Sequence, residues 1–189
     1  MVALNADANF DYLKYMNDPE DKKALLTELM NAYGKEVWNY AFSLTRKWDL
    51  ADDISQEVFI KVFKNLHNFR SDASIRTWLL TITRNTVIDH HRSAFLRKVT
   101  LTDWIGDVGE RQSVEEDVIE RYAVNDLWKL VMKLPVKSRE VLILYAHHQL
   151  SLKEIAEVLG VTEGTVKSRM FHARRKIAKM KERNGYGTE

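Results

Sequence analysis

The sequence predicts an all-α protein built from two small helical domains. Apolar side chains recur with the helical period from residue 20 to 95 and from 115 to 182, and strand patterns are almost absent. Between these halves, a stretch rich in glycine and acidic residues runs from about Thr100 to Glu116. We interpret it as a flexible interdomain linker, and a surface loop inside one domain is the alternative.

The composition excludes several classes of protein. The chain has no cysteine, which excludes a disulfide scaffold and thiolate metal sites and suits a reducing compartment. Its N-terminus lacks the basic start and apolar core of a signal peptide. No apolar run approaches the ~20 residues needed to span a membrane. We therefore expect a soluble cytoplasmic protein without membrane insertion.

Charge is unevenly distributed along the chain, although the net charge is only +2. Residues 103–120 carry seven acidic residues and one basic residue. Residues 167–183 carry eight Lys or Arg and a single acidic residue, Glu182. Such segregation indicates separate partners or a separate linker.

Residues 52–66 predict an amphipathic helix with an unusual outer face. Its core-facing side chains form a wide apolar arc: Ile54, Val58, Phe59, Val62, Phe63 and Leu66. On the opposite side, Ile60 lies among the charged and polar residues Asp53, Gln56, Glu57 and Lys64. An apolar residue ringed by charges is typical of a protein-binding surface, and a solvated face with one exposed isoleucine is the alternative.

The segment 68–92 places a turn before a second helix. "RSDAS" is rich in turn-forming residues, and the helix after it is apolar on most of its circumference. Basic side chains near aromatic rings suit single-stranded nucleic acid, because bases stack on rings while arginines meet phosphates. The alternative is that Phe69 and Trp78 are ordinary core aromatics. We favour a core position for Trp78 and base contact by the loop.

The segment 151–177 predicts a helix-turn-helix. Ser151 and Glu154 form a capping box, and apolar residues follow at helical spacing up to Leu159. Gly160 can end that helix by adopting a positive φ, and Thr162 can cap the next one. Helices joined by a short turn containing glycine are typical of DNA-binding modules, although some such units bind proteins instead.

The second helix of this unit has an apolar stripe and a basic outer face. At roughly 100° per residue, the buried stripe comprises Val166, Met170, Ala173 and Ile177. The opposite arc comprises Gly164, Ser168, Phe171, His172 and Arg175, flanked by Lys167, Arg169, Arg174 and Lys176. A phenylalanine on this face can contact thymine methyl groups in a major groove. Packing of Phe171 on another helix is the alternative.

An enzyme is not indicated, because no nucleophile–base pattern or phosphate-binding loop occurs. The pairs His90–His91 and His147–His148 point about 100° apart on a helix, so they form no i, i+4 metal face. We expect solvated or capping roles for them, with no metal and no cofactor. A ligand-sensing regulator would need a pocket or phospho-acceptor site in the first 100 residues, and we find no such pattern.

The two halves together resemble a known family. "DDISQEVFIKVFKNLHNFRSDASIRTWLLTITRNTVIDHHR" resembles region 2 of bacterial extracytoplasmic-function (ECF) sigma factors, which are group IV of the primary-type sigma factor family. "LPVKSREVLILYAHHQLSLKEIAEVLGVTEGTVKSRMFHARRKI" resembles their region 4. The resemblance implies a non-enzymatic subunit that directs core RNA polymerase to specific promoters, in a stress or envelope response. It implies region 2 at 1–97, a linker at 98–118 and region 4 at 119–189.

The resemblance also implies three sets of binding residues. Core polymerase binding falls on Asp53, Gln56, Glu57 and Ile60, which match the surface for the β′ clamp helices. Recognition of the −10 element falls on Ser71, Asp72, Ala73, Ser74, Arg76, Arg84, Asn85 and Arg92. Recognition of the −35 element falls on Thr165, Lys167, Ser168, Phe171, His172 and Arg175.

The resemblance further implies contact of the protein with the polymerase β flap and with an anti-sigma factor. The acidic linker would suit a basic channel of the polymerase. Ile75 departs from the family pattern, which usually has phenylalanine before "RTWL". We expect this change to affect the −10 loop and the promoter base it prefers, but not the fold.

Overall fold

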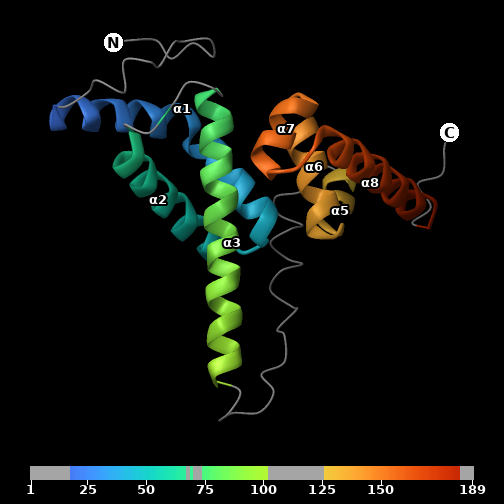
Figure 1. Cartoon of the computed structure of the whole chain (residues 1–189). Coiled ribbons are helices and arrows are strands. Elements are labelled where there is room, and N and C mark those ends of the chain that lie inside the picture. Colours follow the sequence, from blue (N-terminus) through green and yellow to red (C-terminus); the bar gives the residue numbers. More distant parts are fainter. Residues whose placement is uncertain (1–17, 67–68, 70–73, 102–125, 184–189) are drawn as a thin grey trace. The chain divides into compact units, whose positions relative to one another are not determined.

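The computed structural model describes residues 18–66, 69, 74–101 and 126–183, which form an N-terminal and a C-terminal bundle of helices (Figure 1). Apart from a 3₁₀ residue at Leu66, the regular structure in these ranges is α-helical, which confirms the predicted fold class. None of the described helices combines the length and the apolar character needed to cross a membrane.

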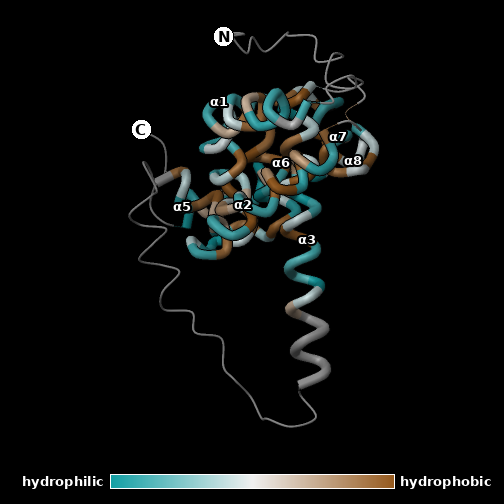
Figure 2. Tube along the Cα trace, turned by 90° about the vertical axis from the view of Figure 1, so that its left-hand side faces the viewer, coloured by the Kyte–Doolittle hydropathy of each residue, from teal (hydrophilic) through white to brown (hydrophobic). Residues whose placement is uncertain are grey.

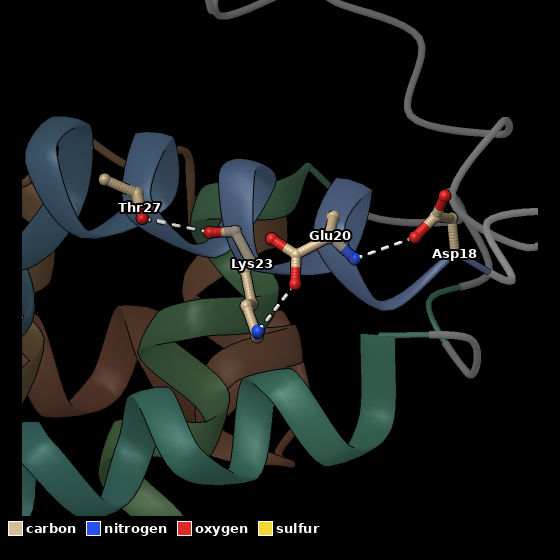
Figure 3. Close-up of polar contacts among 4 residues, drawn as sticks. All are labelled: Asp18, Glu20, Lys23 and Thr27. Carbon is tan, nitrogen blue, oxygen red and sulfur yellow. Dashed lines mark hydrogen bonds and ion pairs between the residues drawn. The ribbon is translucent and has the colours of Figure 1, made fainter.

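Helix α1 (Pro19–Thr45) has a well-defined start. The Asp18 side chain accepts a hydrogen bond from the Glu20 amide at 2.9 Å (Figure 3). Pro19 occupies the first turn, where no amide donor is needed. Glu20 also pairs with Lys23 at 2.7 Å. The helix ends at Thr45, and its C-cap residue Arg46 has a φ of 56°, in the left-handed region.

Helices α2 (Trp48–Asn65) and α3 (Ile75–Leu101) complete the N-terminal bundle. Helix α1 packs on α2, and the Lys61 ammonium of α2 donates to the Thr86 hydroxyl of α3 at 3.1 Å. The fully buried side chains of this bundle include Tyr40, Ile54, Val62, Ile75 and Leu79. Figure 2 shows apolar and polar residues alternating along these helices, as expected when one face of each is buried.

Helix α3 continues past the predicted domain boundary at residue 97 and ends at Leu101. Residues 91–94 are all exposed, so this segment of α3 lies outside the core of the N-terminal bundle. Residues 102–118 of the predicted linker lie outside the described ranges.

The C-terminal bundle comprises α5 (Asp126–Met132), α6 (Val136–Ala146), α7 (Leu152–Leu159) and α8 (Glu163–Arg183). Helix α8 packs on α5 and α6, and Leu144, Val166 and Ala173 have no exposed surface. The buried guanidinium of Arg139 donates to the carbonyl oxygens of Met132 at 2.9 Å and Leu134 at 3.3 Å. It thereby satisfies backbone acceptors where α5 ends.

Two turns of this bundle use the left-handed backbone conformation. Gly160, between α7 and α8, has a φ of 62°, as predicted from the sequence. Gln149, between α6 and α7, has a φ of 54° although it carries a side chain. Both residues allow the chain to reverse direction within a few positions.

Two predictions about burial were wrong. Phe63 was expected in the apolar arc but is 37% exposed, because it lies one turn beyond Ile60 at the rim of that arc. His148 was expected to be solvated or to act as a cap, but its side chain is buried. The chain turns inward after α6, with the His148 amide bonded to the Ile143 carbonyl at 3.0 Å, and carries this ring into the bundle.

Candidate nucleic-acid interface

The outer face of α8 carries an exposed aromatic ring among basic side chains. Phe171 is 62% exposed, and its ring meets the His172 ring edge-on with centroids 5.5 Å apart. This exposure excludes the alternative in which Phe171 packs on another helix. The remaining predicted −35 residues on this face are also exposed, except for half-buried Thr165: Lys167, Ser168, His172 and Arg175.

The buried face of α8 and the cap at its start hold this helix in place. Val166, Met170 and Ala173 are buried, which confirms the predicted stripe, and Ile177 is half-buried. The Thr162 hydroxyl accepts from the Thr165 amide at 3.3 Å and so caps α8. The side chain of Thr165 therefore lies at the cap, where its own hydroxyl is 3.1 Å from that of Thr162.

The start of α7 has the predicted capping box. The Ser151 amide donates to the Glu154 carboxylate at 2.8 Å, and the Glu154 amide donates to the Ser151 hydroxyl at 3.2 Å. The two helices of the helix-turn-helix thus both begin at a side-chain cap. This arrangement fixes the direction of α8 and leaves its basic face open to solvent.

A pocket of about 300 Å³, open to solvent and called the cavity below, lies on the N-terminal bundle between α2 and α3. Its wall combines an aromatic ring, an aliphatic side chain and several hydrogen-bonding groups, contributed by Lys61, Asn65, Trp78, Ile82, Asn85 and Thr86. Trp78, for which we favoured a core position, is only half-buried, because one side of its ring lines the cavity. It tilts against buried Phe69, with ring centroids 5.3 Å apart. An apolar wall with a few polar groups suits a flat heterocycle such as a nucleobase.

Polar contacts hold the cavity wall in position. Lys61 pairs with the Glu57 carboxylate at 2.9 Å, in addition to its bond to Thr86. The Asn65 amide donates to the Lys61 carbonyl at 2.8 Å. Asn85 is exposed at the cavity rim. The wall thus presents amide groups that can both donate to and accept from a base edge.

The predicted −10 residues occupy several different environments. Ser71, Asp72 and Ala73 lie outside the described residues. The Ser74 hydroxyl accepts from the Thr77 amide at 3.1 Å, so it caps α3. Among the remaining residues, Asn85 lines the cavity, Arg84 is half-buried on α3, and Arg92 is exposed further along the same helix.

Arg76 is engaged within the protein. Its Nε donates to the Glu36 carboxylate of α1 at 2.6 Å, and its Nη2 contacts the same oxygen. Burial raises the pKa of the nearby Tyr33 phenol, and the Glu36 charge adds to this shift. The surroundings of the ion pair are therefore partly shielded from water.

The predicted polymerase-binding residues share one exposed side of α2. Asp53 and Gln56 are exposed, Glu57 is half-buried, and Ile60 is 54% exposed. Phe63 extends this surface by one turn, because it follows Ile60 by three residues. The result is an apolar pair bordered by acidic and polar groups. We name these five residues the α2 surface.

Sequence reasoning missed several residues that the structure brings together. The cavity residues Lys61, Asn65, Ile82 and Thr86 come from two helices, and no spacing within one helix indicates their convergence. Glu36 was missed for the same reason. Phe63 could have been found from its i+3 spacing to Ile60. In the described part of the chain, no cluster of His, Cys, Asp or Glu is placed to hold a metal ion.

Comparison with known proteins identifies both bundles. The model for Sigma-70 region 2 matches residues 29–95, and the model for Sigma-70, region 4 matches residues 125–177. The RNA polymerase sigma factor YlaC of Bacillus subtilis (strain 168) is 32% identical over 158 residues, which cover 82% of this chain and 90% of YlaC. The chain belongs to the ECF family of RNA polymerase sigma factors.

Other relatives of this sigma factor have similar identity. The ECF sigma factor SigL of Mycobacterium tuberculosis (strain ATCC 25618 / H37Rv) is 32% identical over 159 residues, covering 82% of this chain and 87% of SigL. The ECF sigma factor SigW of Bacillus subtilis (strain 168) is 28% identical over 161 residues, which cover 80% of this chain and 86% of SigW. The family is non-enzymatic, so its assignment confirms the prediction that the chain is not an enzyme.

Solved structures share the fold of this sigma factor. The sigma factor RpoE from Bartonella quintana, solved in complex with the anti-sigma factor NepR, has a TM-score of 0.65 at 24% identity. That similarity covers 82% of this chain and 96% of the RpoE chain. CnrH, solved in complex with the cytosolic domain of CnrY, has a TM-score of 0.63 at 23% identity. That similarity covers 92% of this chain and 94% of the CnrH chain.

Proposed function

We propose that this sigma factor directs core RNA polymerase to promoters by binding DNA at two separate places. Helix α8 enters the major groove of duplex −35 DNA, and the cavity of the N-terminal bundle holds a base extruded from the −10 element. The observation that carries the proposal is that one chain presents both an exposed basic helix and an open pocket with room for a nucleobase. Specificity is then divided between groove contacts and base capture.

The −35 contacts follow from the composition of the α8 face. Phe171 offers an apolar surface to a thymine methyl group, and Ser168 offers a hydroxyl to a base edge. Lys167 and Arg175 neutralise phosphates, which fixes the helix on the duplex but carries no sequence information. The −10 contacts follow from the cavity, where Trp78 supports the plane of a base and Asn85 bonds to its edge. The 71–74 loop and Arg92 guide the strand toward it.

The α2 surface binds the polymerase, in this proposal, through the β′ clamp helices. Its acidic groups attract basic side chains of the partner, and Ile60 with Phe63 provides the apolar centre that a stable interface needs. Region 4 contacts the β flap. We also propose a cytoplasmic location, because the protein must reach chromosomal DNA, and a role in a stress or envelope response stays a prediction.

The direct test of this function is transcription in vitro. Purified core polymerase, with and without the sigma factor, is supplied with fragmented genomic DNA of the source organism, and the 5′ ends of the transcripts are sequenced. We expect new start sites that share two upstream motifs. Sequence-specific binding without any new start would instead indicate an ordinary regulator that needs a separate sigma factor.

Substitution of Ile60 tests the α2 surface. Ile60→Asp places a charge at the apolar centre, so we expect affinity for core polymerase to fall at least tenfold, a hot-spot effect of about 1.4 kcal/mol or more. The measurement is titration of core polymerase with labelled protein. Met30→Asp, the same change at an exposed residue of α1, is the matched control. Unchanged affinity with a native circular dichroism spectrum would contradict this assignment.

We also propose an anti-sigma factor as a partner, since two proteins of the same fold were solved with NepR and with the cytosolic domain of CnrY. A candidate inhibitor must block transcription in vitro and form a stoichiometric complex with the full chain. Inhibition without complex formation would contradict direct sequestration.

A further inference from the structure

The ion pair between Glu36 and Arg76 joins helices that are distant in the sequence. Glu36 lies in the middle of α1 and Arg76 in the first turn of α3, 40 residues later. Their side chains are only 20% and 33% exposed, so water screens the pair less than it screens most surface ion pairs. Nε and Nη2 of the guanidinium both meet one carboxylate oxygen, which orients the arginine closely.

This geometry argues against a direct phosphate contact by Arg76. A phosphate at the guanidinium would have to displace the Glu36 carboxylate, and that carboxylate would repel it at short range. Arg92, in contrast, is exposed on the same helix. The two arginines of α3 therefore differ in what they can offer to DNA.

Arg76 is close in sequence to the residues of α3 that we propose to face the −10 strand. Ser74, two residues before Arg76, caps α3 through the Thr77 amide. Trp78, two residues after Arg76, lines the cavity, and its own amide donates to the Ser74 carbonyl at 3.0 Å. Movement of the first turn of α3 would displace both the loop before it and the aromatic wall of the cavity.

We propose that Glu36 and Arg76 form a positioning pair that fixes the first turn of α3 on α1 and thereby sets the geometry of the −10 base cavity. The inference rests on the proposed function. It assigns Arg76 a role inside the protein in place of a strand contact, and it assigns a role in −10 selectivity to Glu36, which lies on a different helix from the cavity.

A double-mutant cycle in the holoenzyme tests the pair. The variants are Glu36→Gln, Arg76→Gln, their combination, and the exchanged pair Glu36→Arg with Arg76→Glu. The measurement is open-complex formation on promoters that differ only at the captured −10 base, at several salt concentrations. We expect each single variant to reduce base selectivity about fivefold, the combination to add little, and the exchanged pair to restore part of the loss.

The salt dependence separates positioning from phosphate binding. A positioning residue leaves the slope of log affinity against log salt at its wild-type value, whereas loss of a phosphate contact reduces it by about one. Arg92→Gln is the matched control, and we expect it to lower the slope without changing base selectivity. A lower slope for Arg76→Gln, together with unchanged selectivity for Glu36→Gln, would overturn the proposal.

Hydrogen exchange of the free full-length chain tests the pair without polymerase. If the pair fixes the first turn of α3, Glu36→Gln and Arg76→Gln both accelerate exchange at the Thr77 and Trp78 amides several-fold. Unchanged exchange in both variants would overturn the positioning role whatever the transcription assay gives. Failure of the wild-type holoenzyme to initiate transcription would contradict the proposed function. The hydrogen-exchange result would still show whether Glu36 and Arg76 fix the first turn of α3.

Discussion

Phe171 shows how a single side chain can indicate the function of a helix. Its position on the basic face of α8 was evident from helical periodicity, and its 62% exposure excludes a core role. The burial of Val166, Met170 and Ala173 confirms that the helix is oriented as its pattern predicted. An exposed aromatic ring next to His172 and basic groups supports our proposal of an anionic partner with an apolar spot, as a thymine in a major groove provides.

Replacement of Phe171 by alanine should therefore be sensitive to sequence. We expect transcription to fall most on promoters with thymine at the contacted −35 position, by about 1–3 kcal/mol for the lost base contact. The measurement is run-off transcription from promoters that differ only at that position. Lys167→Ala is the control, because loss of a phosphate contact weakens all sequences alike. Equal loss across every −35 sequence would indicate a packing role for Phe171.

Asn85 is the corresponding residue of the −10 cavity. Asn85→Ala removes an amide at the cavity rim, so we expect selectivity at one −10 position to fall by about 1 kcal/mol, the usual value of one hydrogen bond. The assay is open-complex formation with each of the four bases at that position. His91→Ala, at an exposed residue six positions after Asn85 on α3, is the control for general strand binding. An equal loss with every base would contradict edge recognition by Asn85.

At the scale of the helices, local sequence signals were accurate where they act through neighbouring residues. The capping box of α7, the threonine cap of α8 and the glycine between them all appear as predicted. Each depends on residues within a few positions of one another, so the sequence alone specifies it. The burial predictions for Phe63 and His148 were wrong, because burial at the rim of an apolar arc and the direction of a turn depend on tertiary packing.

The capping box gives a prediction about stability. Ser151→Ala removes the hydroxyl that accepts from the Glu154 amide, so we expect the free energy of unfolding to fall by about 1 kcal/mol. Urea denaturation followed by circular dichroism measures this change. Ser168→Ala, at an exposed position inside α8, serves as the control and should change stability by no more than about 0.5 kcal/mol. A similar loss in both variants would show that capping is not the cause.

At the scale of the whole molecule, the order of two helical halves was enough to predict the family. The cavity and the Glu36–Arg76 pair were not predictable in this way, since each joins residues from separate helices. Helical periodicity describes which residues share a face, but it does not tell which faces meet. The tertiary contacts therefore add the parts of the site to which we assign −10 geometry in our proposal.

The division into two bundles predicts independent contributions to promoter recognition. Phe171 and Asn85 belong to different bundles and share no partner in the described structure, so their effects should add. We expect the combined variant Phe171→Ala, Asn85→Ala to lose the sum of the single losses within about 0.5 kcal/mol. The measurement is open-complex formation on one promoter with all four proteins. A combined loss clearly different from the sum would show that the two binding events are coupled.

The backbone of the C-terminal bundle also affects which mutations this protein can tolerate during evolution. Gly160 and Gln149 adopt nearly the same left-handed conformation, with φ of 62° and 54°. A side chain makes that conformation unfavourable by about 1–2 kcal/mol, and glycine avoids this penalty at a smaller entropic loss. Gln149 is exposed and lies outside the α8 face. Mutation of Gln149 to glycine would therefore raise the free energy of unfolding. The added stability would allow the protein to tolerate destabilising substitutions in α8, including ones that change the promoters it recognises.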